Sequence, residues 1–185
     1  MASDLLVWLF PVSEGVLALL KRADRKAARA HDRGTMWVMW TTIAWSIAAA
    51  VVLRAAVPQA RLPGSNALRN GVSTGLLVVG LTIRWYAILY LGRYFTVNVT
   101  ISQDHELIRT GPYRWVRHPS YTGLMLAFGG VAAFAWNWLS IPAMLVPISC
   151  ALALRISKEE EALRRHFGEA WDAYSKRTGR LLPKL

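Results

Sequence analysis

Cysteine and charge are both scarce in this sequence. The one cysteine, Cys150, lies within an apolar run, which excludes an intrachain disulfide and any motif that needs several cysteines. Charged residues make up 18% of the 185 residues, whereas soluble domains average about 25%. The chain has no HExxH motif, P-loop or nucleophilic triad, and no ligand spacing supports a metal site. These gaps exclude a disulfide framework and disfavour the common metallohydrolase and nucleotide-hydrolase classes.

Acidic residues are also few, 11 against 22 Lys and Arg, so the net charge is +11. A basic chain can bind nucleic acid, an anionic membrane surface or an acidic substrate. No nucleic-acid-binding motif accompanies the charge here, and the basic residues flank apolar stretches. We therefore expect no nucleic-acid partner and interpret the charge as a signal of orientation in a membrane.

Hydrophobic residues make up 54% of the sequence and are gathered into runs nearly free of charge. A transmembrane helix needs about 17 to 25 such residues. The first run is the least regular, because it is short and contains Pro11 and Glu14. The pattern predicts an all-α polytopic integral membrane bundle, with about five transmembrane helices plus a cytoplasmic C-terminal helix. The five runs cover residues 5–20, 36–57, 71–91, 121–136 and 139–154.

Basic residues are unevenly distributed among the segments that join these runs. Segments 21–35 and 92–119 and the tail from Arg155 contain six, four and eight Lys or Arg, against three in the other segments. Cytoplasmic segments carry an excess of Lys and Arg. Five spans would therefore place the N-terminus outside and the C-terminus in the cytoplasm. The high Ala and Arg content suggests a bacterial source, so we expect the bacterial inner membrane.

Two local patterns describe the second half of the chain. Asn137 and Trp138 alone separate the last two runs, which predicts a tight helical hairpin. From Arg155 to Thr178 apolar residues recur at helical spacing. We therefore expect a helix that continues out of the last span, breaks near Gly168 and resumes as a short amphipathic helix.

Two segments of this half carry residues suited to chemistry. Residues 98–123 are too polar to cross a membrane but are rich in aromatic residues and His, and Ser120 could cap the helix that follows. Farther on, Arg155 and Glu159 are four residues apart and share a helix face. A guanidinium can hold a carboxylate, and a carboxylate one turn on can hold an amine. The pair therefore suits one anionic and one cationic ligand.

Each of these residues also has a simpler interpretation. Arg155 could be an anchor at the end of a span, Glu159 to Glu161 a solvated charged turn, and His118 a packed loop residue. His166 is expected at the surface. Arg84 lies inside a span, where an ionisable residue is a functional candidate, but its side chain could also reach the cytoplasmic interface.

Residues from about 92 to 183 resemble a known family. The string GPYRWVRHPSYTG at 111–123 is preceded by DHELIRTG and followed by the hairpin and then RISKEEEALRRHFGEAWDAYSKRTGRLLP. This combination is similar to that of the isoprenylcysteine carboxyl methyltransferase family. The resemblance implies a membrane enzyme that uses S-adenosylmethionine to methylate the carboxylate of a C-terminal prenylated cysteine. It also implies N-terminal transmembrane helices in residues 1–91 and a catalytic part in residues 92–185.

The resemblance implies site residues by position. Arg155 falls where the family has the arginine linked to substrate, and Arg155 and Glu159 form the implied catalytic pair. Asn98 is a weaker match to a cofactor contact. The implied S-adenosylmethionine contacts are His105, Glu106, Leu107, Ile108, Tyr113, His118, Pro119, Ser120, Tyr121 and Glu159.

The implied chemistry agrees with these residue types. Glu159 could take the ammonium of the cofactor, and the groups of 118–121 at a helix N-terminus could take its carboxylate. An acceptor carboxylate is already ionised at pH 7, so methyl transfer needs no general base. This explains why the sequence shows no general acid–base dyad.

The identity of the acceptor stays open at this point. The implied partners are a lipid-linked or amphiphilic small-molecule acceptor and membrane lipids. Related membrane methyltransferases act on phospholipid amines, and membrane sterol reductases share an RHPxYxG-like string. A phospholipid or small-amphiphile methyltransferase, an NADPH-dependent membrane reductase and a non-enzymatic scaffold are therefore the alternatives.

Overall fold

A computed structural model describes residues 9–20, 33–95 and 106–184 of the chain. These residues form six α-helices and three short 3-10 turns, at Pro58–Ala60, Gly92–Tyr94 and Gly111–Arg114. The predicted all-α fold is confirmed. The α-helices are α2 (Leu9–Leu20), α3 (Arg33–Ala56), α4 (Asn66–Leu91), α5 (Pro119–Ala135), α6 (Ser140–Phe167) and α7 (Glu169–Arg177).

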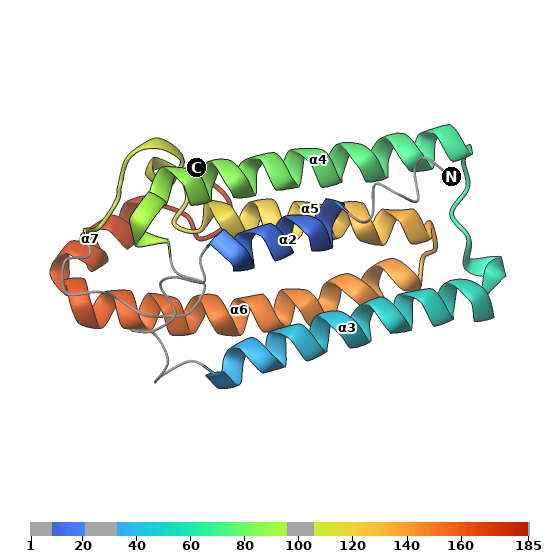
Figure 1. The fold of residues 1–185 in the computed structure, drawn as a ribbon, viewed down its shortest axis with the longest axis horizontal. Coiled ribbons are helices and arrows are strands. Elements are labelled where there is room, and N and C mark those ends of the chain that lie inside the picture. The colour runs from blue at the N-terminus through green and yellow to red at the C-terminus, as the bar shows by residue number, and fades with distance from the viewer. Residues whose placement is uncertain (1–8, 21–32, 96–105, 185) are drawn as a thin grey trace.

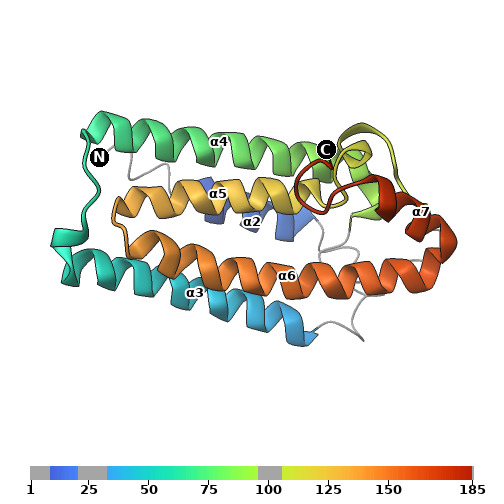
Figure 2. The ribbon, with the colours of Figure 1, turned by 180° about the vertical axis from the view of Figure 1, so that it is seen from behind.

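The long helices lie side by side along one axis (Figures 1 and 2). Helix α5 packs between α4 and α6, α3 packs on the far side of α6, and the short helix α2 contacts α4. Helix α7, the segment before α5 and the C-terminal residues gather at one end of the bundle. The turns that follow α3 and α5 lie at the other end. Residues from both halves of the chain therefore meet at the end that carries α7.

Three of the described helices, α3, α4 and α6, are long and apolar enough to cross a membrane. Helix α5 is shorter, with 17 residues. The 12 residues described in α2 rise about 18 Å, which is less than the hydrocarbon thickness of about 30 Å. The chain is a polytopic integral membrane protein, whereas the count of five spans and the orientation stay predictions.

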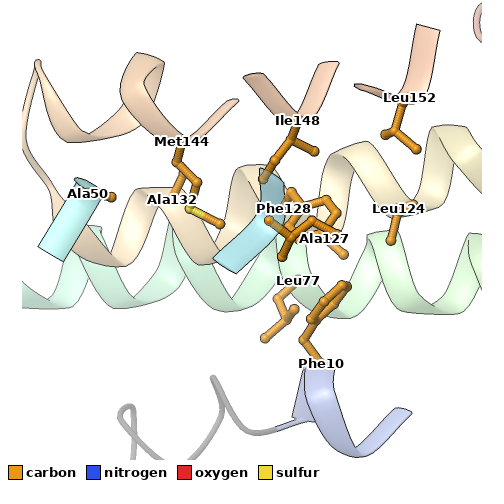
Figure 3. Close-up of a cluster of buried hydrophobic side chains, with 11 residues drawn as sticks. Phe10, Ala50, Leu77, Leu124, Ala127, Phe128, Ala132, Met144, Ile148 and Leu152 are labelled. Carbon is orange, nitrogen blue, oxygen red and sulfur yellow. The ribbon is translucent and has the colours of Figure 1, made fainter. Parts of the chain in front are cut away.

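The apolar core lies around α5, which contributes Leu124, Ala127, Phe128 and Ala132, and side chains of α2, α3, α4 and α6 complete it (Figure 3). Phe10 of α2 packs against Phe128 of α5, with ring centroids 4.7 Å apart. Leu77 of α4 and Met144 and Ile148 of α6 are almost completely buried around them. These contacts hold α5 in the centre of the bundle.

Glycines let the backbones of α4 and α5 touch. A Cβ atom added to Gly80 would lie 2.3 Å from the amide nitrogen of Ala127. One added to Gly123 would lie 2.5 Å from the amide nitrogen of Arg84. Small residues of this kind allow close helix packing within a membrane. The start of α5 is therefore held at a fixed distance from the C-terminal half of α4.

The predicted hairpin and the predicted tail are both confirmed. Asn137 is buried between α5 and α6, and its side-chain oxygen accepts hydrogen bonds from the amides of Leu139 and Ser140 at 2.9 and 3.1 Å. Helix α6 continues past its apolar part to Phe167, and α7 follows Gly168, whose φ of 53° favours glycine. The charged half of α6 thus projects beyond the apolar bundle.

Candidate active site

The segment before α5 and the charged half of α6 meet at the end of the bundle that carries α7. The hydroxyl of Tyr121 accepts a hydrogen bond from Nε of Arg155 at 3.0 Å and donates one to Oε2 of Glu159 at 2.9 Å. Arg155 is buried and Glu159 is half-buried. The prediction that Arg155 and Glu159 share one face of a helix is confirmed, and both reach the same tyrosine on α5.

His118 lies between two carboxylates of α6. Its Nε2 is 3.3 Å from Oε1 of Glu160, and because a carboxylate can only accept, Nε2 donates there. Its Nδ1 is 3.9 Å from Oε1 of Glu159, beyond hydrogen-bonding distance. The imidazole is 4% exposed and packs 5.7 Å from the ring of Tyr121, measured between centroids. His118 is therefore a buried member of the cluster.

Glu160 is the most heavily paired carboxylate of the cluster. Oε1 accepts from Nε of Arg117 at 2.8 Å, and Oε2 accepts from Nε of Arg180 at 2.8 Å. Arg117 also donates to the backbone carbonyls of Ser175 and Thr178. Glu160 therefore ties the loop before α5 to the C-terminal residues, whereas Oε1 of Glu159 receives no donor from the described residues.

Tyr113 joins the segment before α5 to α4 and to α7. Its hydroxyl donates to the carbonyl of Ala87 in α4 at 3.2 Å, and its carbonyl accepts from the hydroxyl of Tyr174 in α7 at 2.6 Å. Burial raises the pKa of Tyr113, and the charge of Glu159 raises it further. Burial also raises the pKa of Tyr174, to about 12, against a partial opposing effect of Arg117. Both phenols are therefore neutral hydrogen-bond donors at neutral pH.

The predicted helix cap at Ser120 is wrong. Helix α5 begins at Pro119, and His118 occupies the position before it without capping the helix by its side chain. Proline suits the first helical position because its φ is already helical and it has no amide hydrogen to satisfy. Ser120 is buried one position farther on, and its carbonyl accepts from Arg84 at 3.5 Å.

Arg84 does not reach an interface. It is 6% exposed, and its Nε and one terminal nitrogen donate to the two carboxylate oxygens of Glu14 in α2 at 2.7 and 2.8 Å. Next to this pair, the indole nitrogen of Trp85 donates to the hydroxyl of Ser13 at 2.6 Å. Arg84 therefore links α2 to the first turn of α5.

The structure leaves the remaining implied cofactor contacts as predictions. His105 and Asn98 lie outside the described residues. Glu106 is exposed and Leu107 and Ile108 are half-buried in an irregular segment, so their cofactor role stays a prediction. The interpretation of His166 as a surface residue is confirmed, since it is exposed near the end of α6.

The sequence reasoning missed three of the charged residues that complete the site. Glu160, Arg117 and Arg180 form an ion-pair cluster, with Nη2 of Arg180 2.6 Å from Oε2 of Glu160. The weak signal was the run of three glutamates beside an Arg-His-Pro string. Helical spacing selects Glu159 as the partner of Arg155 but does not show that Glu160 is nearly buried while Glu161 stays exposed.

Comparison with known proteins gives consistent matches. A family model described as the isoprenylcysteine carboxyl methyltransferase (ICMT) family matches residues 73–165. A probable protein-S-isoprenylcysteine O-methyltransferase of Oryza sativa subsp. indica is 32% identical over 110 residues, which cover 58% of this chain and 58% of that protein. A protein-S-isoprenylcysteine O-methyltransferase of Tribolium castaneum is 34% identical over 116 residues, covering 62% of this chain and 41% of that protein.

A solved structure of the eukaryotic intramembrane Ras methyltransferase ICMT is also similar to this fold. The TM-score is 0.63 at 27% sequence identity, and the match covers 83% of this chain and 53% of that chain. The chain therefore spans about half the length of the relatives it matches.

Proposed function

The chain belongs to the isoprenylcysteine carboxyl methyltransferase family, and from this premise we propose that it transfers a methyl group from S-adenosylmethionine to the carboxylate of an isoprenylcysteine-like acceptor. The acceptor is lipid-linked or otherwise amphiphilic, and the reaction takes place at the cytoplasmic membrane face. One observation carries the proposal: Arg155 and Glu159 contact the same hydroxyl, that of Tyr121, at the start of the charged half of α6.

The donor set of the cluster fits the charged groups of S-adenosylmethionine. When bound, the cofactor supplies a methyl group activated by a sulfonium charge, and it also carries an ammonium and a carboxylate. Glu159 retains acceptor capacity on Oε1, beside the buried imidazole of His118, and would hold the ammonium. In the first turn of α5, Pro119 has no amide hydrogen and the amide of Tyr121 donates to the carbonyl of His118, so the amide of Ser120, at a helix N-terminus that favours an anion, would hold the carboxylate.

Arg155 would orient the acceptor. A guanidinium binds a carboxylate with directional, charge-assisted hydrogen bonds, and the hydrogen bond from Arg155 to Tyr121 fixes its plane. The acceptor carboxylate is ionised at pH 7 and needs no base from the chain. The contribution of the protein is therefore to position the reacting groups and to exclude water from them.

Aromatic residues around this end of the bundle support a place for the site at the membrane interface. Tyr86, Tyr90 and Trp115 are exposed on α4 and on the segment before α5. Tyr and Trp concentrate where a membrane meets water. A lipid-anchored acceptor would therefore meet its charged cosubstrate at this depth, with residues 92–185 as the catalytic part and α4 from residues 1–91 as its support.

Cofactor binding is the first test. Titration calorimetry of the purified protein in detergent with S-adenosylhomocysteine should show binding by the wild-type chain. Glu159→Gln should weaken that binding at least about tenfold, since a charge-assisted contact is lost. Glu161→Gln is the matched control, because Glu161 is an exposed glutamate on the same helix that pairs with Arg165. Absence of wild-type binding would overturn the proposal, and binding of NADPH instead would favour the reductase.

The acceptor is the second test. We would incubate the protein with methyl-labelled S-adenosylmethionine and either a farnesylcysteine analogue or phospholipid vesicles. A carboxyl methyl ester releases volatile methanol in alkali, whereas a methylated amine does not. Alkali-labile label on the farnesylcysteine analogue is expected, and Arg155→Ala should abolish it while leaving S-adenosylhomocysteine binding intact. Alkali-stable label in the lipid fraction would replace this acceptor with a phospholipid amine.

A further inference from the structure

The C-terminal residues after α7 run alongside the loop before α5 (Figure 2). The amides of Arg117 and His118 donate to the carbonyls of Gly179 and Arg180 at 2.8 and 3.0 Å. Farther on, the hydroxyl of Thr122 donates to the carbonyl of Leu181 at 2.7 Å. We call residues 178–182 the C-terminal strap. Through its backbone the strap holds the segment that carries His118.

Arg180 adds a side-chain contact to this backbone pairing. It places Nε and Nη2 at 2.8 and 2.6 Å from Oε2 of Glu160, while Oε1 faces Arg117 and His118. The side chain of Glu160 is 12% exposed and that of Arg180 is 53% exposed. Arg180 of the strap therefore holds Oε2 of Glu160, and Oε1 of Glu160 holds the imidazole of His118.

We propose that the C-terminal strap is a positioning element of the cofactor site and that Arg180 acts on His118 through Glu160. This inference rests on the proposed function. With Glu160 held on one side by Arg180, Nε2 of His118 stays on Glu160 and Nδ1 stays turned toward Glu159. Glu159, which would hold the cofactor ammonium, and the imidazole of His118 are thus kept in register by a residue whose side chain touches neither.

Gly179 shows that the path of the strap is tightly constrained. A Cβ atom at this position would lie 1.7 Å from the carbonyl oxygen of Leu182. Because that oxygen belongs to the backbone, the strap would have to move to admit even alanine. Thr178 is buried beside it, and its hydroxyl donates to the carbonyl of Tyr174. A small substitution here therefore displaces the strap without changing a charge.

The test is a double-variant cycle on S-adenosylhomocysteine affinity, measured by calorimetry with the full chain in detergent. Arg180→Gln should weaken binding about fivefold, as expected for the loss of one charge-assisted contact at a half-exposed site. In a Glu160→Gln background the same change should have no further effect, because the path through Glu160 is already broken. Arg180→Lys should restore part of the affinity. Arg177→Gln, an exposed arginine at the end of α7, is the control and should bind like the wild type.

Kinetics separate a positioning role from a merely structural one. Arg180→Gln should raise KM for S-adenosylmethionine. It should leave KM for the acceptor within about twofold of wild type and the thermal midpoint within a few degrees of it. Gly179→Ala should weaken cofactor binding in the same direction. Affinity of Arg180→Gln equal to wild type, or an equal loss in both backgrounds, would overturn the inference while the proposed function stands. Failure of the wild-type chain to bind would overturn both.

Discussion

The buried pair of Arg84 and Glu14 gives a quantitative test of how this bundle is held together. Two parallel hydrogen bonds of 2.7 and 2.8 Å join the side chains, which are 8% and 13% exposed. The perturbation is Glu14→Gln, which keeps the shape of the side chain and removes its charge. Arg84 then remains buried with no carboxylate to balance it.

The expected cost follows from the burial. Removing one partner of a buried ion pair costs about 3 to 5 kcal/mol in soluble proteins. Insertion scales assign about 2.5 to 3.5 kcal/mol to an arginine at the centre of a membrane helix. We therefore take about 3 kcal/mol, which lowers the thermal midpoint of a chain of this size by about 6 to 12 °C. Arg84→Gln should cost a similar amount, because it leaves Glu14 buried instead.

The double variant distinguishes a charge effect from a loss of packing. Glu14→Gln combined with Arg84→Gln leaves no unpaired buried charge at this site, so it should lose less stability than either single variant. The assay is thermal unfolding in detergent followed by tryptophan fluorescence. Arg54→Gln is the control, because this exposed arginine makes a 3.3 Å contact with one carbonyl and should shift the midpoint by less than about 2 °C. Single variants that also shift it by less than that, or a double variant equal to their sum, would refute the reasoning.

Three further predictions concern packing, orientation and alkaline stability. Gly80→Ala should destabilise the protein by about 1 to 3 kcal/mol, because its new methyl group meets backbone, whereas Gly75→Ala on the same helix has open space and should raise the thermal midpoint. In a chain whose native cysteine is replaced by serine, a cysteine at Lys176 should be protected from a membrane-impermeant maleimide added outside intact cells, and one at Gln59 should be labelled. The reverse pattern would contradict the predicted orientation. The pKa of Tyr174 is raised from 10.0 to about 12, so its contribution to stability is complete below pH 10 and is lost as the pH rises toward 12. Urea titration of Tyr174→Phe should therefore show a smaller fall in stability over that interval than wild type.

Much of the fold could be predicted because local chemistry decides it. The two charge-free runs on either side of Asn137 and Trp138 predicted the hairpin. Apolar residues at helical spacing predicted the helix that continues out of the last span, because this spacing indicates a helix whatever the helix packs against. The first run was harder. It contains Pro11 and Glu14, and the structure describes a helix of 12 residues there. Its length and composition alone do not show whether it crosses the membrane.

The site could be predicted in part. Arg155 and Glu159 were selected by helical spacing and by resemblance, and the structure places both against Tyr121. Glu160 and Arg180 could not be selected in this way. They are 20 residues apart in the sequence, and each stands among other charged residues from which spacing does not separate it.

The sequence by itself determined the helical class, the membrane setting, the hairpin and the one face of α6 that carries Arg155 and Glu159. These properties depend on composition and on the period of a helix, which neighbouring residues set. Tertiary structure alone decided which glutamate is exposed, which partner balances Arg84, and that the C-terminal strap reaches the loop before α5. Such pairings join residues far apart in the chain, and burial selects among many charges that look alike in the sequence.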